Sequence, residues 1–409
     1  MEYWSRTDVL DSLIKQGIIT LDRGRVISSI DLMKYPGDYP VYSSSAQKNG
    51  YFGSFDLFDF NEELITWSVD GGGYFFYRPK HKFSVTNVSG ILRIAKSDKI
   101  DYKFLYYLLV YQHKNQIFDY VDKAHPSVIK KRYFIPEIEF KEQTQIATIL
   151  SKVDEAITKT EQLIAKYTRI KTGLMQDLLT KGIDENGNIR SEETHEFKDS
   201  PLGRIPKVWE CDKLGNIGKV SRGKFTPRPR NNPIYYGGKY PFIQTGDISN
   251  CKTLYLDNYS QTLNEKGVAV SKRFSKGTIV MTIAANIGDT AILKQDMYLT
   301  DSVVGIKSKL NEIYLELFFK SIKTLLENTA TQSAQKNINI EKLNQILIKF
   351  PTSSIEQEVI VNKYTKIGNL IYNFETQLSK LQSLKTGLMQ DLLSGKVRVN
   401  HLIKETASV

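Results

Sequence analysis

The chain has 409 residues, of which 41% are hydrophobic, and a formal net charge of +11. This length is too great for a single core and this hydrophobic content excludes disorder throughout, so we expect two or three packed domains. The two cysteines, Cys211 and Cys251, are too few for a disulfide framework or a zinc site, and no apolar stretch approaches the length of a membrane span. We therefore expect a cytoplasmic protein whose basic character favours a polyanionic partner.

The first segment, residues 1–141, has short runs of β-forming residues followed by one amphipathic helix. Tyr39–Ser43 and Glu63–Trp67 are typical of strands, and Tyr102–Gln112 is typical of a short helix. This mixture predicts a first α/β domain.

A long helix is expected next, over residues 142–182. Its apolar residues follow alternating steps of four and three from Ile146 to Leu178, with Thr160 and Lys171 as interruptions, which is the heptad pattern of a coiled coil. A glycine lies just past the last apolar residue, where helices commonly end. Residues 183–199 are polar and predict a linker.

The same order of segments then recurs. Residues 200–351 again combine strand-like runs, such as Tyr240–Thr245 and Thr278–Ile283, with a short helix at Glu312–Leu326. Residues 352–396 carry a second heptad seam, with two serines at capping-box spacing before Glu356. Residues 397–409 are expected to form a tail.

The chain is an internal duplication. Lys171–Leu179 recurs without change at Lys385–Leu393, and the offset of 214 also carries Glu142 onto Glu356. Two long apolar stripes of equal length can cover each other, so we expect an antiparallel pair within the chain. Packing of each helix on its own domain, or dimerisation through the stripes, is the alternative. The predicted fold class is α+β: two α/β domains joined by two long antiparallel coiled-coil helices, with a pseudo-twofold internal repeat.

Two basic clusters are candidate contacts for phosphates. The second domain has five cations within twelve residues and no acid among them: Lys219, Arg222, Lys224, Arg228 and Arg230. The first domain has a similar cluster before its long helix: Lys123, His125, Lys130, Lys131 and Arg132. Gln332 and Lys336 occupy the comparable place in the second domain. A solvated basic surface is the alternative interpretation.

Polar side chains on loops with small residues are candidates for reading base edges. They are Ser43, Ser44, Gln47, Lys48 and Asn49 in the first domain, and Gln244, Thr245 and Asn286 in the second. Ordinary hydrogen bonding at the surface would account for any single one of them equally well.

No catalytic motif is complete. Asn232–Tyr235 resembles the Asn-Pro-Pro-Tyr motif of amino-methyltransferases, but Ile234 stands at its third position and no glycine-rich turn accompanies it. Glu139–Lys141 matches half of a nuclease site without the upstream acid. There is no phosphate-binding loop for ATP, and the five histidines are too scattered to form a metal site. We predict no catalytic and no metal-binding residue.

Over nearly its whole length the chain resembles the specificity subunits of type I restriction–modification systems. The resemblance rests on the duplicated helix ends, on Pro201–Trp209 and Tyr240–Ile248, and on Lys276–Ile283 with Gly288 beyond it. It implies a non-catalytic subunit with two target-recognition domains, each binding one half of a bipartite double-stranded DNA sequence. The long helices would then serve as spacer and docking surface.

The resemblance also implies partners. Two modification subunits would methylate adenine with S-adenosylmethionine, and restriction subunits would translocate and cut DNA with ATP and Mg²⁺. No cofactor is expected in this chain itself.

The repeated helix ends carry identical side chains that we expect to be exposed, at or beyond the edge of the heptad seam, and packing alone does not require that identity. We predict that they are paired docking sites for two identical partner subunits: Thr172, Met175, Gln176, Asp177, Thr386, Met389, Gln390 and Asp391. A recent duplication would also explain the identity.

Two other functions stay open at this point. One is a stand-alone homodimeric nucleic-acid-binding protein that uses the helices to dimerise. The other is a cytoplasmic interaction scaffold whose domains bind protein, which would show no salt-sensitive affinity for duplex DNA.

Overall fold

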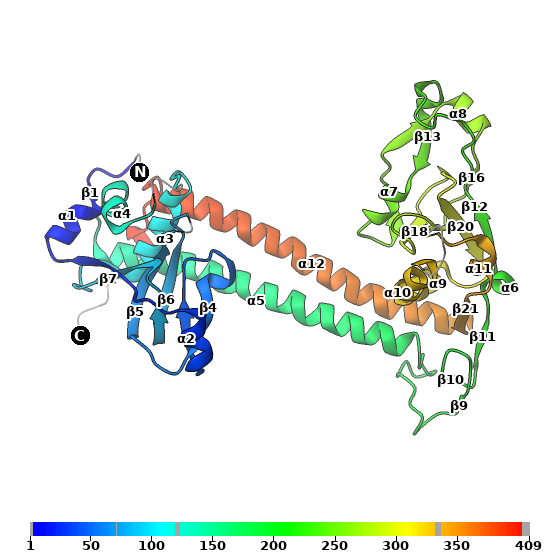
Figure 1. The fold of residues 1–409 in the computed structure, drawn as a ribbon, viewed down its shortest axis with the longest axis horizontal. Coiled ribbons are helices and arrows are strands. Elements are labelled where there is room, and N and C mark those ends of the chain that lie inside the picture. Colours follow the sequence, from blue (N-terminus) through cyan, green and yellow to red (C-terminus); the bar gives the residue numbers. More distant parts are fainter. Residues whose placement is uncertain (1–2, 71, 119–122, 332–336, 403–409) are drawn as a thin grey trace. The chain divides into compact units, whose positions relative to one another are not determined.

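A computed structural model describes residues 3–70, 72–118, 123–331 and 337–402. The chain divides into two compact units, which are described separately. The first unit comprises Met1–Leu163 with Phe374–Val409, and the second comprises Ile164–Asn373 (Figure 1). Each unit therefore contains one α/β domain, the first part of one long helix and the last part of the other.

The first unit is built on a six-stranded sheet of order β2-β7-β5-β6-β3-β4, in which only β3 and β6 are parallel neighbours. The strands are β2 (Ile19–Arg23), β3 (Tyr39–Tyr42), β4 (Tyr51–Phe55), β5 (Phe60–Ser68), β6 (Phe75–Val85) and β7 (Ser89–Ile94). The helices are α1 (Leu10–Lys15), α2 (Ser29–Lys34), α3 (Tyr102–His113) and α4 (Pro126–Arg132), and β1 (Thr7–Val9) pairs with β8 (Phe134–Pro136).

The second unit has two sheets, of orders β12-β20-β17-β18-β14 and β15-β13-β19-β16. The strands of the first sheet are β12 (Gly218–Arg222), β14 (Tyr255–Leu256), β17 (Ile279–Thr282), β18 (Thr290–Leu293) and β20 (Val303–Ser308). Those of the second are β13 (Tyr236–Ile243), β15 (Gln261–Leu263), β16 (Arg273–Phe274) and β19 (Met297–Leu299). Two short ladders pair β9 (Phe197–Lys198) with β10 (Ile205–Pro206) and β11 (Trp209–Lys213) with β21 (Leu347–Pro351).

Short helices connect these strands: α6 (Leu214–Ile217), α7 (Thr245–Ser249), α8 (Glu265–Ala269), α9 (Glu312–Ser321), α10 (Lys323–Thr331) and α11 (Ile340–Asn344). The single helix expected over Glu312–Leu326 is thus two helices, because the chain leaves helical geometry at Ile322. The four-strand order β2-β7-β5-β6 of the first unit corresponds to β12-β20-β17-β18 of the second. The expected likeness of layout between the two domains is therefore a likeness of strand order.

The long helices are α5 (Phe140–Leu178) and α12 (Ser354–Leu393), and they run antiparallel within each unit. In the first unit Lys385 Nζ lies 2.6 Å from Asp154 Oδ1, and in the second the Lys171 ammonium lies 4.5 Å from the centroid of the Tyr364 ring. Seam residues such as Ile146 are buried in the domain cores. The predicted fold class, with its internal repeat and paired long helices, is confirmed.

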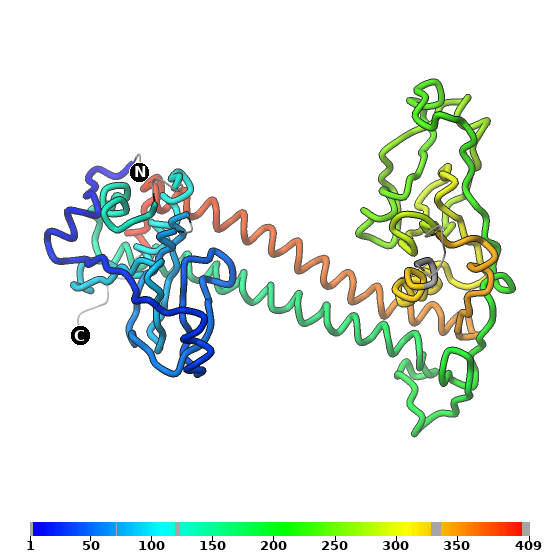
Figure 2. The backbone as a smooth tube through the Cα atoms, viewed as in Figure 1, coloured from blue at the N-terminus to red at the C-terminus, as the bar shows by residue number. Residues whose placement is uncertain are grey.

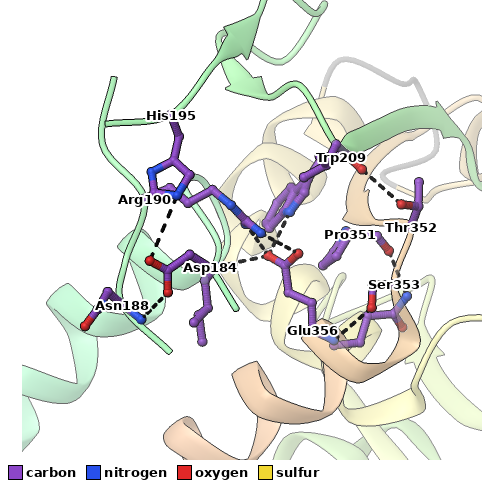
Figure 3. A network of polar contacts seen from close by, with 12 residues as sticks. Asp184, Asn188, Arg190, His195, Trp209, Pro351, Thr352, Ser353 and Glu356 are labelled. Carbon is purple, nitrogen blue, oxygen red and sulfur yellow. Dashed lines mark hydrogen bonds and ion pairs between the residues drawn. The ribbon is translucent and has the colours of Figure 1, made fainter. Parts of the chain in front are cut away.

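The repeated Glu356 is the centre of a polar network in the second unit (Figure 3). Its carboxylate accepts hydrogen bonds from Arg190 Nη1 and Nη2 at 2.6 and 3.0 Å, from Ile183 N at 3.0 Å and from Trp209 Nε1 at 3.0 Å. The expected capping box at Ser353 is only half present: Glu356 N donates to Ser353 Oγ at 3.4 Å, but the Glu356 side chain turns to Arg190 instead of the helix start. The stronger, charged partner takes the carboxylate.

Glu142 makes the matching contact in the first unit. Its carboxylate accepts from Arg398 Nε and Nη2 at 2.8 and 2.6 Å and from Val399 N at 3.3 Å. The first described residues also reach this place, since Trp4 Nε1 donates to Leu393 O at 3.0 Å, and Figure 2 shows the blue start of the described chain near the red end of the tube. The arginines lie in the segments that the sequence predicts as linker and tail.

The neighbouring glutamines repeat a second structural role. Gln143 Oε1 accepts from the backbone N of Asp101, the N-cap of α3, at 3.0 Å. Gln357 Oε1 accepts from the backbone N of Asn311, the N-cap of α9, at 2.8 Å. The repeated Glu-Gln pair therefore ties each long helix to one arginine and to one short helix.

Candidate nucleic-acid interface

The basic loop of the second unit is organised around one acid, Asp301. Arg222, at the end of β12, donates through Nε to Asp301 O at 2.5 Å. Arg228 Nη2 and Arg230 Nη2 lie 3.3 and 2.6 Å from Asp301 Oδ2. The sequence interpretation of an acid-free cluster is corrected here: the fold brings in Asp301, which lies 71 residues after Arg230, and it neutralises part of the charge, while Lys224 stays exposed.

The first unit has the same corner, which sequence reasoning missed. Arg23, at the end of β2, donates through Nη2 to Asn87 O, as Arg222 does to Asp301 O. Arg25 Nε lies 2.9 Å from Asp59 Oδ1. The signal was present as Arg23-Gly24-Arg25 and Arg222-Gly223-Lys224, but the offset between them is not 214 and so did not fall in the repeat register.

The glycine in each triplet explains the conservation of this corner between the units. A Cβ on Gly24 would lie 2.0 Å from Val85 O, and one on Gly223 would lie 2.0 Å from Thr300 O. Only glycine lets the backbone pass so close to the end of the neighbouring strand. The two flanking cations are thereby presented at the same place in both units, where both are exposed.

The predicted base-reading residues of the first unit lie on the loop after β3. Ser43 Oγ accepts from Thr86 Oγ1 at 3.0 Å, and Ser44 is half-buried. Lys48 and Asn49 are exposed and adopt left-handed backbone conformations, with φ of 48° and 54°. This loop follows the strand that pairs with the end of β6, next to the Arg23–Arg25 corner.

Their counterparts in the second unit follow β13. Gln244 precedes α7, its backbone N donating to Asp247 Oδ2 at 2.8 Å and its Nε2 to Gln261 Oε1 at 2.5 Å. Thr245 is half-buried at the start of α7. Asn286 is exposed on the β17–β18 turn, where its Nδ2 donates to Ser249 Oγ at 3.1 Å.

Two lysines of the cluster before α5 have acidic partners of their own. Lys123 Nζ lies 2.9 Å from Asp70 Oδ1 and Lys130 Nζ lies 2.8 Å from Asp11 Oδ1. His125 is the N-cap of α4, accepting from Ser127 N at 3.4 Å, while Lys131 is exposed. Gln332 and Lys336 lie outside the described residues, so the comparison with the second unit ends at Asn339, the N-cap of α11.

The predicted docking residues differ in exposure. Six lie on accessible parts of the helix ends, either exposed or half-buried: Thr172, Gln176, Asp177, Thr386, Gln390 and Asp391. Met175 is half-buried against the core of the second unit. The expected exposure is wrong for Met389, which is 3% exposed because it packs into the core of the first unit with Leu392 and Leu393.

Across residues 3–70, 72–118, 123–331 and 337–402, no group of three or more His, Cys, Asp or Glu side chains is arranged to hold a metal ion. Within the same ranges, no helix combines the length and the apolar character needed to cross a membrane.

Comparison with known proteins identifies the family. A family model described as the type I restriction modification DNA specificity domain matches residues 16–168 and 206–383, one match in each half of the duplication. The chain belongs to this family. It is thus a DNA specificity subunit of the type I restriction–modification class, as the helix ends and strand motifs implied.

Two curated specificity subunits align with most of this chain. The MjaVIII specificity subunit of Methanocaldococcus jannaschii is 27% identical over 398 residues, spanning 90% of this chain and 88% of that one. The putative MjaX specificity subunit of the same organism is 28% identical over 338 residues, spanning 79% and 74%. The match therefore includes both domains and both helices.

Solved structures agree on the fold. The S subunit from M. genitalium has a TM-score of 0.61 at 17% identity, with 95% of each chain covered. The HsdS subunit from Thermoanaerobacter tengcongensis has a TM-score of 0.51 at 15% identity, with 96% of this chain and 97% of that one covered. As a specificity subunit the chain is the non-catalytic recognition part of its enzyme, and S-adenosylmethionine and ATP belong to the modification and restriction subunits.

Proposed function

We propose that each unit of this specificity subunit contacts one half of a bipartite double-stranded DNA sequence through the Arg-Gly-Arg or Arg-Gly-Lys corner and the loop after the adjacent strand. The observation that carries the proposal is the recurrence of this corner, with the same arginine-to-carbonyl contact, in two domains whose other loops differ. Exposed cations at a fixed backbone position suit phosphates, which position a protein on DNA. The neighbouring loop residues, Ser43 and Ser44 or Gln244 and Thr245, then lie where sequence is read.

Charge alone also supports the second cluster of the first domain. Lys123 and His125 precede α4, and Lys130 and Lys131 lie in it. Gln332 and Lys336, at the comparable place in the sequence of the second domain, lie outside the described residues. Lys123 and Lys130 already have acidic partners, so they would contribute less counterion release than the exposed Arg23 and Lys224. We rank this cluster second.

We further propose that two modification subunits dock on the repeated helix ends, at Thr172, Gln176 and Asp177 in one unit and at Thr386, Gln390 and Asp391 in the other. Restriction subunits, and a location in the cytoplasm with the DNA, belong to the same proposal. Its support is that these exposed or half-buried side chains are identical in both copies although the helix surfaces between them are not.

The experiment for DNA contact is co-expression with the modification subunit in a host without DNA methylation, followed by mapping of N6-methyladenine. We expect one two-part motif that is lost when the specificity subunit is omitted. Exchange of residues 200–351 for those of another family member should change one half-site only. Change of both halves, or of neither, would contradict the assignment of one half-site to each domain.

Docking is tested with matched charge changes. Gln176→Arg with Gln390→Arg should abolish co-purification of the modification subunit, because both sites are exposed and equivalent. The control is Glu161→Arg with Glu375→Arg, an exposed pair at the same repeat offset along the same helices, which should leave assembly intact. Equal loss in both double variants would show that added charge, and not the repeated helix end, disturbs the complex.

A further inference from the structure

The first recognition domain buries a guanidinium with unused donors. Arg78, on β6, is 1% exposed. Its Nε donates to Thr66 Oγ1 at 3.0 Å, but among the described residues neither Nη1 nor Nη2 has a hydrogen-bond partner. The guanidinium carbon lies 3.6 Å from the centroid of the Tyr42 ring and 4.9 Å from that of Phe76. Two ring faces and one hydroxyl hold the cation while both terminal nitrogens lack an acceptor.

Such an arrangement is destabilising in the free protein. A buried charge needs a counter-ion or a full set of hydrogen bonds to offset its desolvation, and cation–π contacts supply only part of that. Burial lowers the pKa of Arg78 to about 10, so the group is still charged at neutral pH. The packing of the domain does not explain why an arginine stands here.

The second unit has an apolar residue at the position equivalent to Arg78. Arg23 and Arg222 occupy the same place on β2 and β12, and they face Gly90 and Val304. Those two residues face Trp67 and Met281 on the next strand. Following the ladders one strand further, from Trp67 to Phe75 and from Met281 to Thr290, makes Leu293 the counterpart of Arg78.

The neighbours of Leu293 are apolar as well. The same ladders make Val280 the counterpart of Thr66 and Ala291 the counterpart of Phe76. Ile243 is the counterpart of Tyr42, because it forms the parallel pair with Leu299 that Tyr42 forms with Val85. All four second-unit residues are buried members of one hydrophobic cluster. The same fold thus packs aliphatic side chains at this place in the second unit and buries a destabilising arginine there in the first.

A loop of unusual backbone covers the guanidinium. A Cβ on Gly50 would lie 3.0 Å from Arg78 Nη2, so the chain at Gly50 rests directly on the unpaired nitrogen. Lys48, Asn49 and Gly50 are three consecutive residues with positive φ, a conformation that L residues adopt at a cost. The loop is closed at its base by Ser43 N donating to Gly50 O at 2.8 Å.

We propose that Arg78 is a concealed DNA contact: the loop Ser43–Gly50 shifts when the first domain meets its half-site, and Nη1 and Nη2 then pair with two acceptor atoms of the DNA. This rests on the proposed function of the first unit. A guanidinium presents its two terminal nitrogens as a fork that fits either two phosphate oxygens or O6 and N7 of a guanine. Stacking on Tyr42 and the bond to Thr66 hold the fork in one orientation.

The decisive variant copies the second unit. Thr66→Val with Arg78→Leu installs the residues found at Val280 and Leu293, so the sheet is expected to keep or raise its melting temperature. Binding of the complex with the modification subunit to the two-part duplex defined by methylation mapping should weaken about 10- to 100-fold. A phosphate contact predicts loss for any first half-site and a fall of about one in the slope of log affinity against log salt. A guanine contact predicts loss for the cognate half-site with little change in slope.

Unchanged affinity of the folded double variant would overturn the proposal and leave Arg78 as a structural group. If the double variant does not fold, Arg78→Lys takes its place, because lysine keeps the charge but lacks the two-nitrogen fork. Undiminished DNA affinity of Arg78→Lys would also overturn the proposed two-acceptor contact. Arg23→Gln with Arg25→Gln tests the proposed function separately. Weakened binding in that variant with normal binding in the Arg78 variants refutes only the concealed contact, whereas normal binding in both refutes DNA contact at this corner.

Discussion

Glu142 in the first unit and Glu356 in the second lie in the first turn of the two long helices, and each accepts hydrogen bonds from an arginine that follows the end of the other helix. The arginines, Arg398 and Arg190, belong to segments of different length and sequence, yet the contact is the same. In contrast, the sheets of the two recognition domains share a strand order but not their interior side chains, as Arg78 and Leu293 show. The duplication has kept these two glutamate–arginine contacts, the joints between the long helices, and has varied the loops and cores of the recognition domains.

The two joints are not equally buried. In the second unit the side chains of Arg190 and Glu356 are 10% and 9% exposed, and Trp209 Nε1 adds a further donor. In the first unit Glu142 is buried but the Arg398 side chain is 49% exposed, lying over the Trp4 ring at 5.0 Å. If the glutamate carboxylate is removed, water can therefore hydrate Arg398 more easily than it can hydrate Arg190.

The largest expected effect separates these joints. Glu356→Gln should destabilise the protein by about 3 kcal/mol, because it leaves a buried guanidinium without its carboxylate. Glu142→Gln, the same substitution at the equivalent position, should cost about 1–2 kcal/mol, since the partner is half exposed. Calorimetric melting of both variants measures the difference. Equal losses would mean that burial does not distinguish the two joints.

The first joint has a pH dependence of known sign. Hydrogen bonding from Arg398 holds the pKa of Glu142 below its ordinary value. The stabilisation it gives is therefore present above the ordinary pKa and is lost as pH falls through the lowered one. The stability gap between the wild type and Glu142→Gln should accordingly narrow in acid and be constant from pH 6 to 8. A gap that widens in acid would contradict this account.

Much of this architecture could be predicted from sequence because it depends on two local signals, an exact repeat and a heptad period of apolar residues. The identical Lys171–Leu179 and Lys385–Leu393 fixed the duplication, and the heptad seams fixed the helix pair. The joints could not be predicted, because Arg190 and Arg398 lie at unequal distances from the repeated glutamates and contact them only after the chain has turned back.

The candidate interface was predicted only in part, for a similar reason. Arg222 and Lys224 were found as part of a local run of basic residues. Arg23 and Arg25 follow Asp22 and belong to no such run, so they became recognisable only because Arg23 and Arg222 occupy the same place on β2 and β12. Asp301 was missed because it is remote in sequence from the arginines that it binds. The burial of Met389 was also missed. Its position in the heptad period lies at the edge of the seam, but its side chain is buried in a domain core.

A second interior difference between the units gives the next prediction. Glu316 on α9 is fully buried, five residues after the N-cap Asn311, where the first unit has Tyr106 five residues after Asp101. Thr290 Oγ1 donates to its Oε1 at 2.9 Å and Lys320 Nζ lies 3.3 Å away. Among the described residues its Oε2 has no hydrogen-bond partner. Burial raises the pKa of Glu316 above its ordinary value.

Glu316→Gln should therefore stabilise the protein by about 1–2 kcal/mol at pH 8. A carboxyl with a raised pKa favours the folded state below its ordinary pKa, and this contribution is lost as pH rises through the raised one. The gain from glutamine should thus vanish near pH 4, where the glutamic acid is itself neutral. Thermal melts at the two pH values provide the measurement. Destabilisation at pH 8 would show that the ion pair with Lys320 outweighs the cost of burial.

The smallest expected effect concerns the backbone of the loops that differ between the units. Lys48 in the first unit and Ala285 in the second are non-glycine residues with φ of 48° and 62°. Lys48→Gly and Ala285→Gly should each raise stability by about 0.5–1 kcal/mol, because glycine adopts this conformation without a Cβ clash. Asn49→Gly, at a φ of 54°, is the matched control and should gain less, since asparagine tolerates the left-handed region. If Lys48→Gly gains stability but slows DNA binding while Ala285→Gly does not, the loop over Arg78 is the one whose conformation matters for recognition.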